Sequence, residues 1–217
     1  MTYGQCKKAS LQLIFSESIA GTPIQSSYNN QADYERMIPA LVNDGMMYIA
    51  TTVKKIPAMA PLWSLNKNDS DPNFDVYFLP DDCFEMMNGG LVLSHKKNDF
   101  DEIANRVHHV YRLYGGNQLW LPKGKGDNLY LEYWRYPKQF SDNPDDNEEL
   151  DNTPDTQAII PYWVAAQAVM YDDPFRHATL YNMWTDRLNN LKPNPTFIED
   201  SHVEDVYGFG QFTGWFG

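Results

Sequence analysis

The sequence predicts an α+β fold: a bundle of about four helices, an antiparallel β region inserted in the chain, and an extended arm at the C-terminal end. Three observations predict this organisation. Up to residue 56, and again over residues 153–191, apolar side chains recur every three or four residues, which is the period of a helix. Residues 74–136 instead hold β-branched and aromatic runs separated by turn residues. Beyond residue 192 neither period persists.

Two helices are expected in the first part of the chain. The first covers about residues 2–16 and ends before a turn at residues 20–23. The second covers residues 33–56 and is longer, with an apolar stripe of Ile38, Val42, Gly45, Ile49, Val53 and Ile56. Pro39 should kink this long helix, because proline removes one backbone hydrogen bond. The prolines at positions 57 and 61 are expected to end it.

The inserted β region is assigned to residues 74–140. Its first strand, residues 75–79, is followed by an expected turn at residues 88–90. Residues 115–117, Gly-Gly-Asn, predict a hairpin, since these residue types tolerate a positive φ. The last strand, residues 129–136, has apolar or aromatic side chains on both faces. Both faces should therefore be covered, by the core or by a neighbouring chain.

The strongest helical signal lies in residues 153–191, which predict an antiparallel αα-hairpin. Thr153 can cap the first helix, and Pro154 suits its first turn. Asp172-Asp173-Pro174 repeats this start signal for a second helix. Pro161 lies inside the first helix and should kink it. Because the joint is short, the two helices are expected to lie antiparallel.

The end of the chain alternates glycine with aromatic residues and cannot hold a helix, because each glycine costs roughly 1 kcal/mol relative to alanine. Two interpretations are open: a tail folded back over its own core, or an arm that docks into a partner. The anchors of such an arm would be Tyr207, Phe209, Phe212, Trp215 and Phe216. We therefore divide the chain into N-terminal helices (residues 1–73), the β region (74–140), the helical hairpin (141–192) and the arm (193–217).

Charge and hydropathy restrict the functional classes to which this protein can belong. A net charge of −12 over 217 residues argues against nucleic-acid binding through phosphates, which needs a clustered basic face. No apolar run approaches the roughly 20 residues that cross a bilayer, and no signal peptide is evident. We therefore expect a protein made in the cytoplasm, with no membrane partner. Cys6 and Cys83 are expected to be free thiols.

The sequence predicts no catalytic residue, no cofactor and no metal site. His108-His109 lies in an expected strand, where neighbours point to opposite faces and cannot chelate one metal. Residues 69–80 begin as a calcium loop does but lack its glycine and its terminal glutamate. Residues 123–126 lack the frame of a phosphate-binding loop. Paired acids such as Asp81-Asp82 and Glu148-Glu149 leave a carboxylate-dependent hydrolase as an alternative.

Several short phrases, in a fixed order of elements, are similar to those of a known family. They are Met1-Thr-Tyr-Gly-Gln5, Ser18-Ile-Ala-Gly-Thr-Pro23, Ile49-Ala-Thr-Thr-Val-Lys-Lys-Ile56, Tyr77-Phe-Leu-Pro-Asp-Asp-Cys83, Leu131-Glu-Tyr-Trp-Arg-Tyr-Pro137, and Tyr162-Trp-Val-Ala165 followed by Asp173-Pro174. Over most of residues 1–192 this order resembles the head-to-tail adaptor (connector) proteins of tailed bacteriophages, particularly those of short-tailed phages.

The resemblance implies a structural virion protein and not an enzyme. Adaptors of this type form a ring of twelve subunits under the portal protein, line the DNA channel and attach tail or nozzle proteins at the virion neck. Genomic DNA would pass without sequence-specific binding, because an acidic channel wall, formed in part by residues 142–155, repels phosphates. A monomeric assembly or binding module is the alternative.

The same resemblance gives the aromatic residues of the helical hairpin a second role. One face of the hairpin must pack on the long helix, but the hairpin carries more aromatic surface than one such contact needs. The side chains expected at the interface between ring subunits are Trp163, Tyr171, Tyr181 and Trp184. The arm would hold the portal or a neighbouring subunit.

Overall fold

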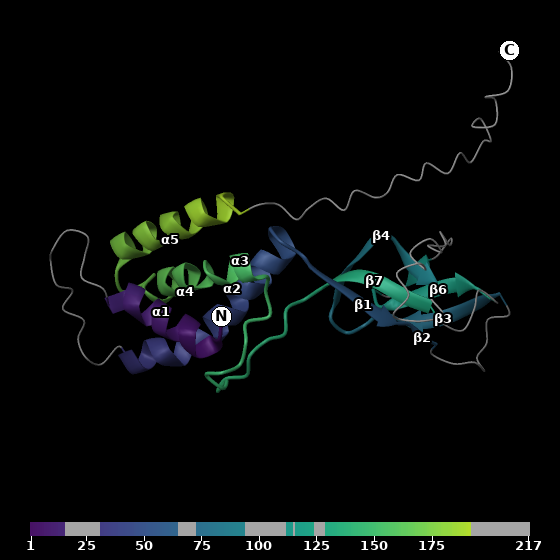
Figure 1. Ribbon diagram of the computed structural model, residues 1–217, viewed down its shortest axis with the longest axis horizontal. Coiled ribbons are helices and arrows are strands. Elements are labelled where there is room, and N and C mark those ends of the chain that lie inside the picture. The colour runs from purple at the N-terminus through teal and green to yellow at the C-terminus, as the bar shows by residue number, and fades with distance from the viewer. Residues whose placement is uncertain (16–30, 65–72, 94–111, 115, 124–128, 192–217) are drawn as a thin grey trace, which may run out of the picture.

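A bundle of helices and a small β-sandwich make up the computed structural model, which describes residues 1–15, 31–64, 73–93, 112–114, 116–123 and 129–191 (Figure 1). The described residues combine helices with antiparallel sheets, so the predicted α+β class is confirmed. The arm, residues 193–217, lies outside the described residues together with its five expected anchors. The histidine pair at positions 108 and 109 also lies outside them.

The helical bundle is arranged around its fourth helix. The helices in the described residues are α1 (Tyr3–Phe15), α2 (Gln31–Thr52), α3 (Pro154–Gln157), α4 (Ile160–Ala168) and α5 (Pro174–Asn189). Helix α4 packs against α1, α2 and α5, which surround it. Figure 1 shows α5 along one side of α4, with α1 and α2 on the other. The predicted pairing of the last two long helices is therefore confirmed.

The bundle core consists mainly of the apolar faces of α2 and α4. Ile38, Val42 and Ile49 of α2 are fully buried, which confirms that part of the predicted stripe. They pack in one cluster with Ile160 and Val164 of α4. Burying one such side chain contributes roughly 1.5–3 kcal/mol. This packing fixes the central helix between its neighbours.

The predicted long helix ends early, at Thr52 and not at residue 56. The backbone N–H of Lys54 donates to the Ile49 carbonyl (2.8 Å), which closes the last turn. Pro57 disfavours a helical conformation at the residue before it, Ile56. Residues Ile56–Pro61 instead form strand β1, with alternating burial. Strands therefore precede residue 74, where the β region was expected to start.

The first helix of the predicted hairpin is divided in two. Helix α3 ends at Gln157, and α4 begins at Ile160. Pro161 thus falls in the first turn of α4, where its missing N–H is not needed, and does not kink a continuous helix. The prediction of one continuous helix kinked at Pro161 is therefore wrong.

The caps of the hairpin agree in part with the sequence. Thr153 occupies the N-cap of α3 as predicted, but its side chain makes no capping hydrogen bond. Thr156 Oγ1 instead donates to the Thr153 carbonyl (2.8 Å). At the second start, Asp173 is a true N-cap, because its carboxylate accepts a hydrogen bond from the Arg176 backbone N–H (3.0 Å).

Two antiparallel sheets form the sandwich. The first has the order β1–β7–β4, with β4 at Cys83–Leu93 and β7 at Leu129–Arg135. The second has the order β2–β3–β6–β5, at Trp63–Ser64, Phe74–Phe78, Gln118–Pro122 and Arg112–Tyr114. The sheets share one buried core of Leu62, Tyr77, Leu119, Leu121, Leu129, Leu131 and Tyr133. The sandwich is thus separate from the bundle core.

The strand predictions have mixed outcomes. The hairpin is confirmed: β5 pairs with β6, and Gly116 has a φ of +83° in the turn. The expected turn at residues 88–90 is wrong, because these residues lie within β4, where the pairing with β7 shifts between Met86 and Leu91. An irregularity in the ladder accommodates the glycines without reversing the chain. The prediction that both faces of β7 are covered holds fully for one face, where Leu129, Leu131 and Tyr133 are buried. Tyr130 and Trp134 on the other face are half-buried, and Tyr136 just beyond the strand is 36% exposed.

Candidate functional site

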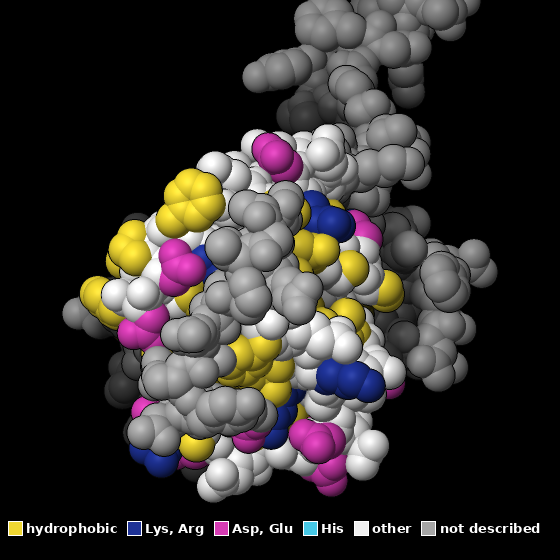
Figure 2. Space-filling model, turned by 90° about the vertical axis from the view of Figure 1, so that its left-hand side faces the viewer, with side chains coloured by type: hydrophobic (Ala, Val, Ile, Leu, Met, Phe, Trp, Pro, Cys, Tyr) yellow, Lys and Arg dark blue, Asp and Glu magenta, His cyan; other side chains and the backbone are white. Residues whose placement is uncertain are grey.

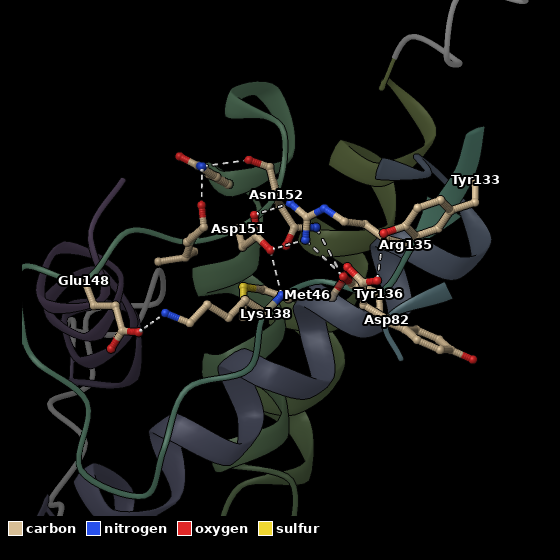
Figure 3. Close-up of polar contacts among 11 residues, drawn as sticks. Met46, Asp82, Tyr133, Arg135, Tyr136, Lys138, Glu148, Asp151 and Asn152 are labelled. Atoms are coloured by element: carbon tan, nitrogen blue, oxygen red, sulfur yellow. Dashed lines mark hydrogen bonds and ion pairs between the residues drawn. The ribbon is translucent and has the colours of Figure 1, made fainter. Parts of the chain in front are cut away.

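The chain passes between bundle and sandwich twice, and an ion pair closes the second passage (Figure 3). Arg135, the last residue of β7, donates from Nη1 and Nη2 to the two carboxylate oxygens of Asp151 (2.5 and 2.6 Å). The Lys138 backbone N–H also donates to Asp151 (2.7 Å). Such bidentate geometry is the strongest form of this interaction. It joins the end of the sandwich to the segment that enters α3.

The contacts of Asp151 and Arg135 favour the charged form of both side chains. Burial alone would raise the pKa of Asp151, but hydrogen bonds from the Arg135 side chain and the Lys138 amide outweigh it and lower the pKa. The hydrogen bond with Asp151 in turn raises the pKa of Arg135. Both side chains are about three-quarters buried, at 23% and 28% exposed. The pair is therefore an ionised, largely buried link between the sandwich and the segment before α3.

Two further ion pairs lie at the first passage, where α2 leads into β1. Lys54 pairs with Asp155 in α3, and Lys55 pairs with Glu85 in β4. The Lys55 ammonium also lies over the Phe84 ring, 5.5 Å from its centroid. Consecutive lysines thus bind opposite parts of the molecule, the first the bundle and the second the sandwich. Together with Arg135–Asp151 they hold the two parts in one arrangement.

The N-terminal residues bind the acidic segment that precedes α3. The Tyr3 N–H donates to the Glu148 carbonyl (2.7 Å), and the Leu150 N–H donates to the Met1 carbonyl (3.0 Å). Gly4 is part of this contact, because a Cβ at this position would lie 2.8 Å from the Asp146 Cβ. The start of the chain therefore holds the backbone of this segment in place.

The side chains of this acidic segment remain at the surface. Asp142, Asp145, Asp146 and Glu149 are exposed, and the described residues provide no ion pair for them. Backbone contacts therefore hold a row of exposed carboxylates at the surface, and Asp146 among them lies beside Gly4 of α1. Whether this row faces a channel stays a prediction.

Three of the four residues predicted at a subunit interface form an aromatic cluster that also includes Tyr48 of α2. Trp163 lies 4.7 Å from Trp184 between ring centroids and stacks on Tyr48 at 5.8 Å. Tyr181 lies 5.4 Å from Trp184. Trp184 is only 2% exposed and packs inside its own chain, whereas Tyr48 and Tyr181 are 40% and 39% exposed. Only the edge of this cluster is open to a partner.

The fourth predicted residue, Tyr171, lies apart from the cluster, at the joint between α4 and α5. It is 88% exposed, and the nearby Phe175 is 84% exposed. The joint itself is held firmly: the Tyr34 hydroxyl donates to Asp172 (2.6 Å), and Arg176 Nη2 donates to the Leu13 carbonyl (2.6 Å). Figure 2 shows this end of the bundle, where apolar side chains reach the surface beside acidic ones. A rigid support under two exposed rings is typical of a binding surface.

The described residues provide little for chemical catalysis. They contain no group of three His, Cys, Asp or Glu side chains arranged to hold a metal. Burial raises the pKa of Cys6 to about 12, so its thiol stays protonated. Among the helices that the structure describes, none has the length and hydropathy of a membrane span.

Sequence reasoning missed three parts of this site. Tyr48 falls outside the apolar stripe of its helix, and only its spacing of three from Gly45 indicates that it approaches the same helix face. Phe175 follows the helix start Asp173-Pro174 and could have been noted as an exposed aromatic residue. The Arg135–Asp151 pair has no local signal, since Arg135 ends β7 and Asp151 lies sixteen residues later in the segment before α3.

A comparison with protein families gives a match over nearly the whole chain. The family model described as SU10 adaptor protein matches residues 1–201. The matched range includes the bundle, the sandwich and the residues at the junction between them. No curated protein sequence matches the chain.

Proposed function

The chain belongs to the SU10 adaptor protein family, and from this premise we propose that it forms a twelve-subunit ring that joins a phage head to its tail. Membership confirms the resemblance to head-to-tail adaptors and gives the chain a structural role in a bacteriophage virion. The observation that supports the twelve-subunit ring is the exposure of two aromatic side chains, Tyr171 and Phe175, at the α4–α5 joint. The Tyr34–Asp172 hydrogen bond holds this joint in place. Subunits that assemble bury such side chains.

Within the ring, the helical bundle provides the contacts between subunits. Tyr171 contacts the neighbouring subunit directly, and Tyr181 does so through its exposed edge. Trp163 and Trp184 support Tyr181 from inside, because they pack against it in the same cluster. The β-sandwich faces the tail or nozzle proteins. The ion pairs at the junction keep the sandwich at a fixed angle to the ring.

The acidic segment lines the channel through which genomic DNA passes. Its exposed carboxylates repel phosphates, so DNA slides without being gripped. The backbone hydrogen bonds to the N-terminal residues hold this segment in place. The arm, residues 193–217, binds the portal protein or a neighbouring subunit. The assembled ring lies at the virion neck, and its subunits are made in the host cytoplasm.

The mass of the purified full-length chain, alone and mixed with portal protein, tests this proposal. Light scattering should detect a closed ring, formed by the chain alone or on the portal. A chain that stays monomeric alone and with every virion component would contradict the ring and favour a monomeric assembly module. Removing residues 193–217 should leave the fold intact and abolish docking to assembled portals. Unimpaired docking would count against the role of the arm.

A further inference from the structure

Helix α1 has an open groove along its outer face. In the part of the chain that the structure describes, its lining comprises Gly4, Lys7, Lys8, Leu11, Gln12 and Phe15 of the helix, with Asp146 at the Gly4 end. These positions recur every three or four residues, so the groove follows the full length of the helix. Helix α1 contains two lysines and no acidic residue. The groove is therefore basic in its middle and apolar towards Phe15, which is 36% exposed.

The α4–α5 joint has the complementary character. Tyr171 and Phe175 supply exposed rings, and Asp172 and Asp173 lie between them in the sequence. The carboxylate of Asp172 is fixed by the Tyr34 hydroxyl (2.6 Å), and that of Asp173 by the first turn of α5. The joint thus presents aromatic rings and negative charge in one fixed arrangement. A surface that carries lysines and apolar side chains would be complementary to the joint in charge and in apolar contact.

The two surfaces are different patches of the subunit. Arg176 Nη2 donates to the Leu13 carbonyl (2.6 Å), so the joint lies beside the C-terminal end of α1, and the groove runs from there along α1 towards Gly4 (Figure 1). A closed ring requires a heterologous contact, in which one patch of a subunit meets a different patch of the next. The groove and the complementary joint are two such patches.

We propose that the α4–α5 joint of one subunit docks into the α1 groove of the next copy of the chain. Tyr171 and Phe175 pack against Leu11 and Phe15, and the aspartates of the joint lie beside Lys7 and Lys8. Lys7 pairs with Glu35 of its own chain at 3.8 Å. Lys8 is exposed. This contact rests on the proposed ring and identifies which two surfaces close it.

Engineered cysteines in the full-length chain test this contact. Cys83 is replaced by serine, while Cys6 is kept because it is fully buried. The double variant Lys8→Cys with Phe175→Cys, mixed with portal protein and oxidised, should give a ladder of covalent multimers. Each single variant alone should stay uncross-linked. A mixture of the two single variants should give dimers and nothing larger, because each chain then has one reactive end.

Four results would overturn the contact. Rings of normal mass without Lys8→Cys to Phe175→Cys cross-links would show that other surfaces close the ring, while the proposed function stands. Dimers from a single variant alone would indicate a two-fold contact. A ladder from Lys8→Cys with Phe209→Cys, but not with Phe175→Cys, would show that the groove takes the C-terminal arm. Absence of any ring from the unmodified chain with portal would contradict the proposed function and this contact together.

Discussion

Replacing Asp151 with alanine should reduce the free energy of unfolding by about 2 kcal/mol. The change removes both hydrogen bonds to Arg135 and the acceptor of the Lys138 N–H. Removing one partner from a fully buried ion pair costs about 3–5 kcal/mol, whereas exposed pairs contribute about 0–1 kcal/mol. The two side chains are 23% and 28% exposed, so the expected cost lies between these limits.

Urea unfolding followed by tryptophan fluorescence and circular dichroism measures this cost. The matched control is Lys138→Ala in the same segment, because the Lys138 side chain is 75% exposed and its pair with Glu148 is 3.3 Å long. The control should stay within about 0.5 kcal/mol of the unmodified chain. An equally small effect of Asp151→Ala would refute the view that this pair fixes the junction.

The pH dependence gives a second check on the same pair. The pKa of Asp151 is lowered in the folded chain, so the unfolded carboxyl takes up its proton first as the pH falls. The stabilisation is therefore complete above the unfolded pKa, about 4, and is lost as the pH falls through the folded value. The difference in unfolding free energy between the unmodified chain and Asp151→Asn should shrink below about pH 4. A difference that stays constant in acid would contradict the assignment.

Three other predictions concern packing, assembly and reactivity. Gly4→Ala should destabilise the chain by about 1–3 kcal/mol in thermal unfolding, because its Cβ would lie 2.9 Å from the Asp146 carbonyl oxygen; unchanged stability would mean that residues 1–4 do not hold the acidic segment. Tyr171→Ser with Phe175→Ser should leave the unfolding free energy of the monomer within about 0.5 kcal/mol while abolishing ring formation in light scattering, and rings of normal mass would exclude the joint from the interface. Cys6 should react with a thiol reagent only on unfolding, since burial raises its pKa to about 12, whereas the half-buried Cys83 should react in the folded chain; equal rates for both would contradict the burial of Cys6.

The helices of this fold were predictable where their packing is local. The stripe from Ile38 to Ile49 and the start at Asp173-Pro174 depend on residues within a few positions of one another. The strand β1 was missed because its pairing partner, β7, is distant in the sequence. Its apolar residues Ile56, Ala58 and Ala60 fit a strand, but Ile56 also continued the helical period of α2.

The candidate site was predictable only in part, for a related reason. Aromatic residues in excess of one packing stripe indicated an interface in the hairpin, and Tyr171 lies on the surface as such a role requires. The burial of Trp184 depends on Tyr48, Trp163 and Tyr181, which come from three different helices. The ion pairs at the junction likewise join residues that are distant in the sequence. Their positions follow from the tertiary fold, which local patterns do not contain.

Electron microscopy of the full-length chain bound to its portal protein tests the central claim most directly. Our account predicts a ring of twelve subunits beneath the portal, with the α4–α5 joint of each bundle against α1 of the next and the sandwich on the side of the tail. A single chain bound without neighbours, or a ring in which Tyr171 and Phe175 touch no other subunit, would contradict it.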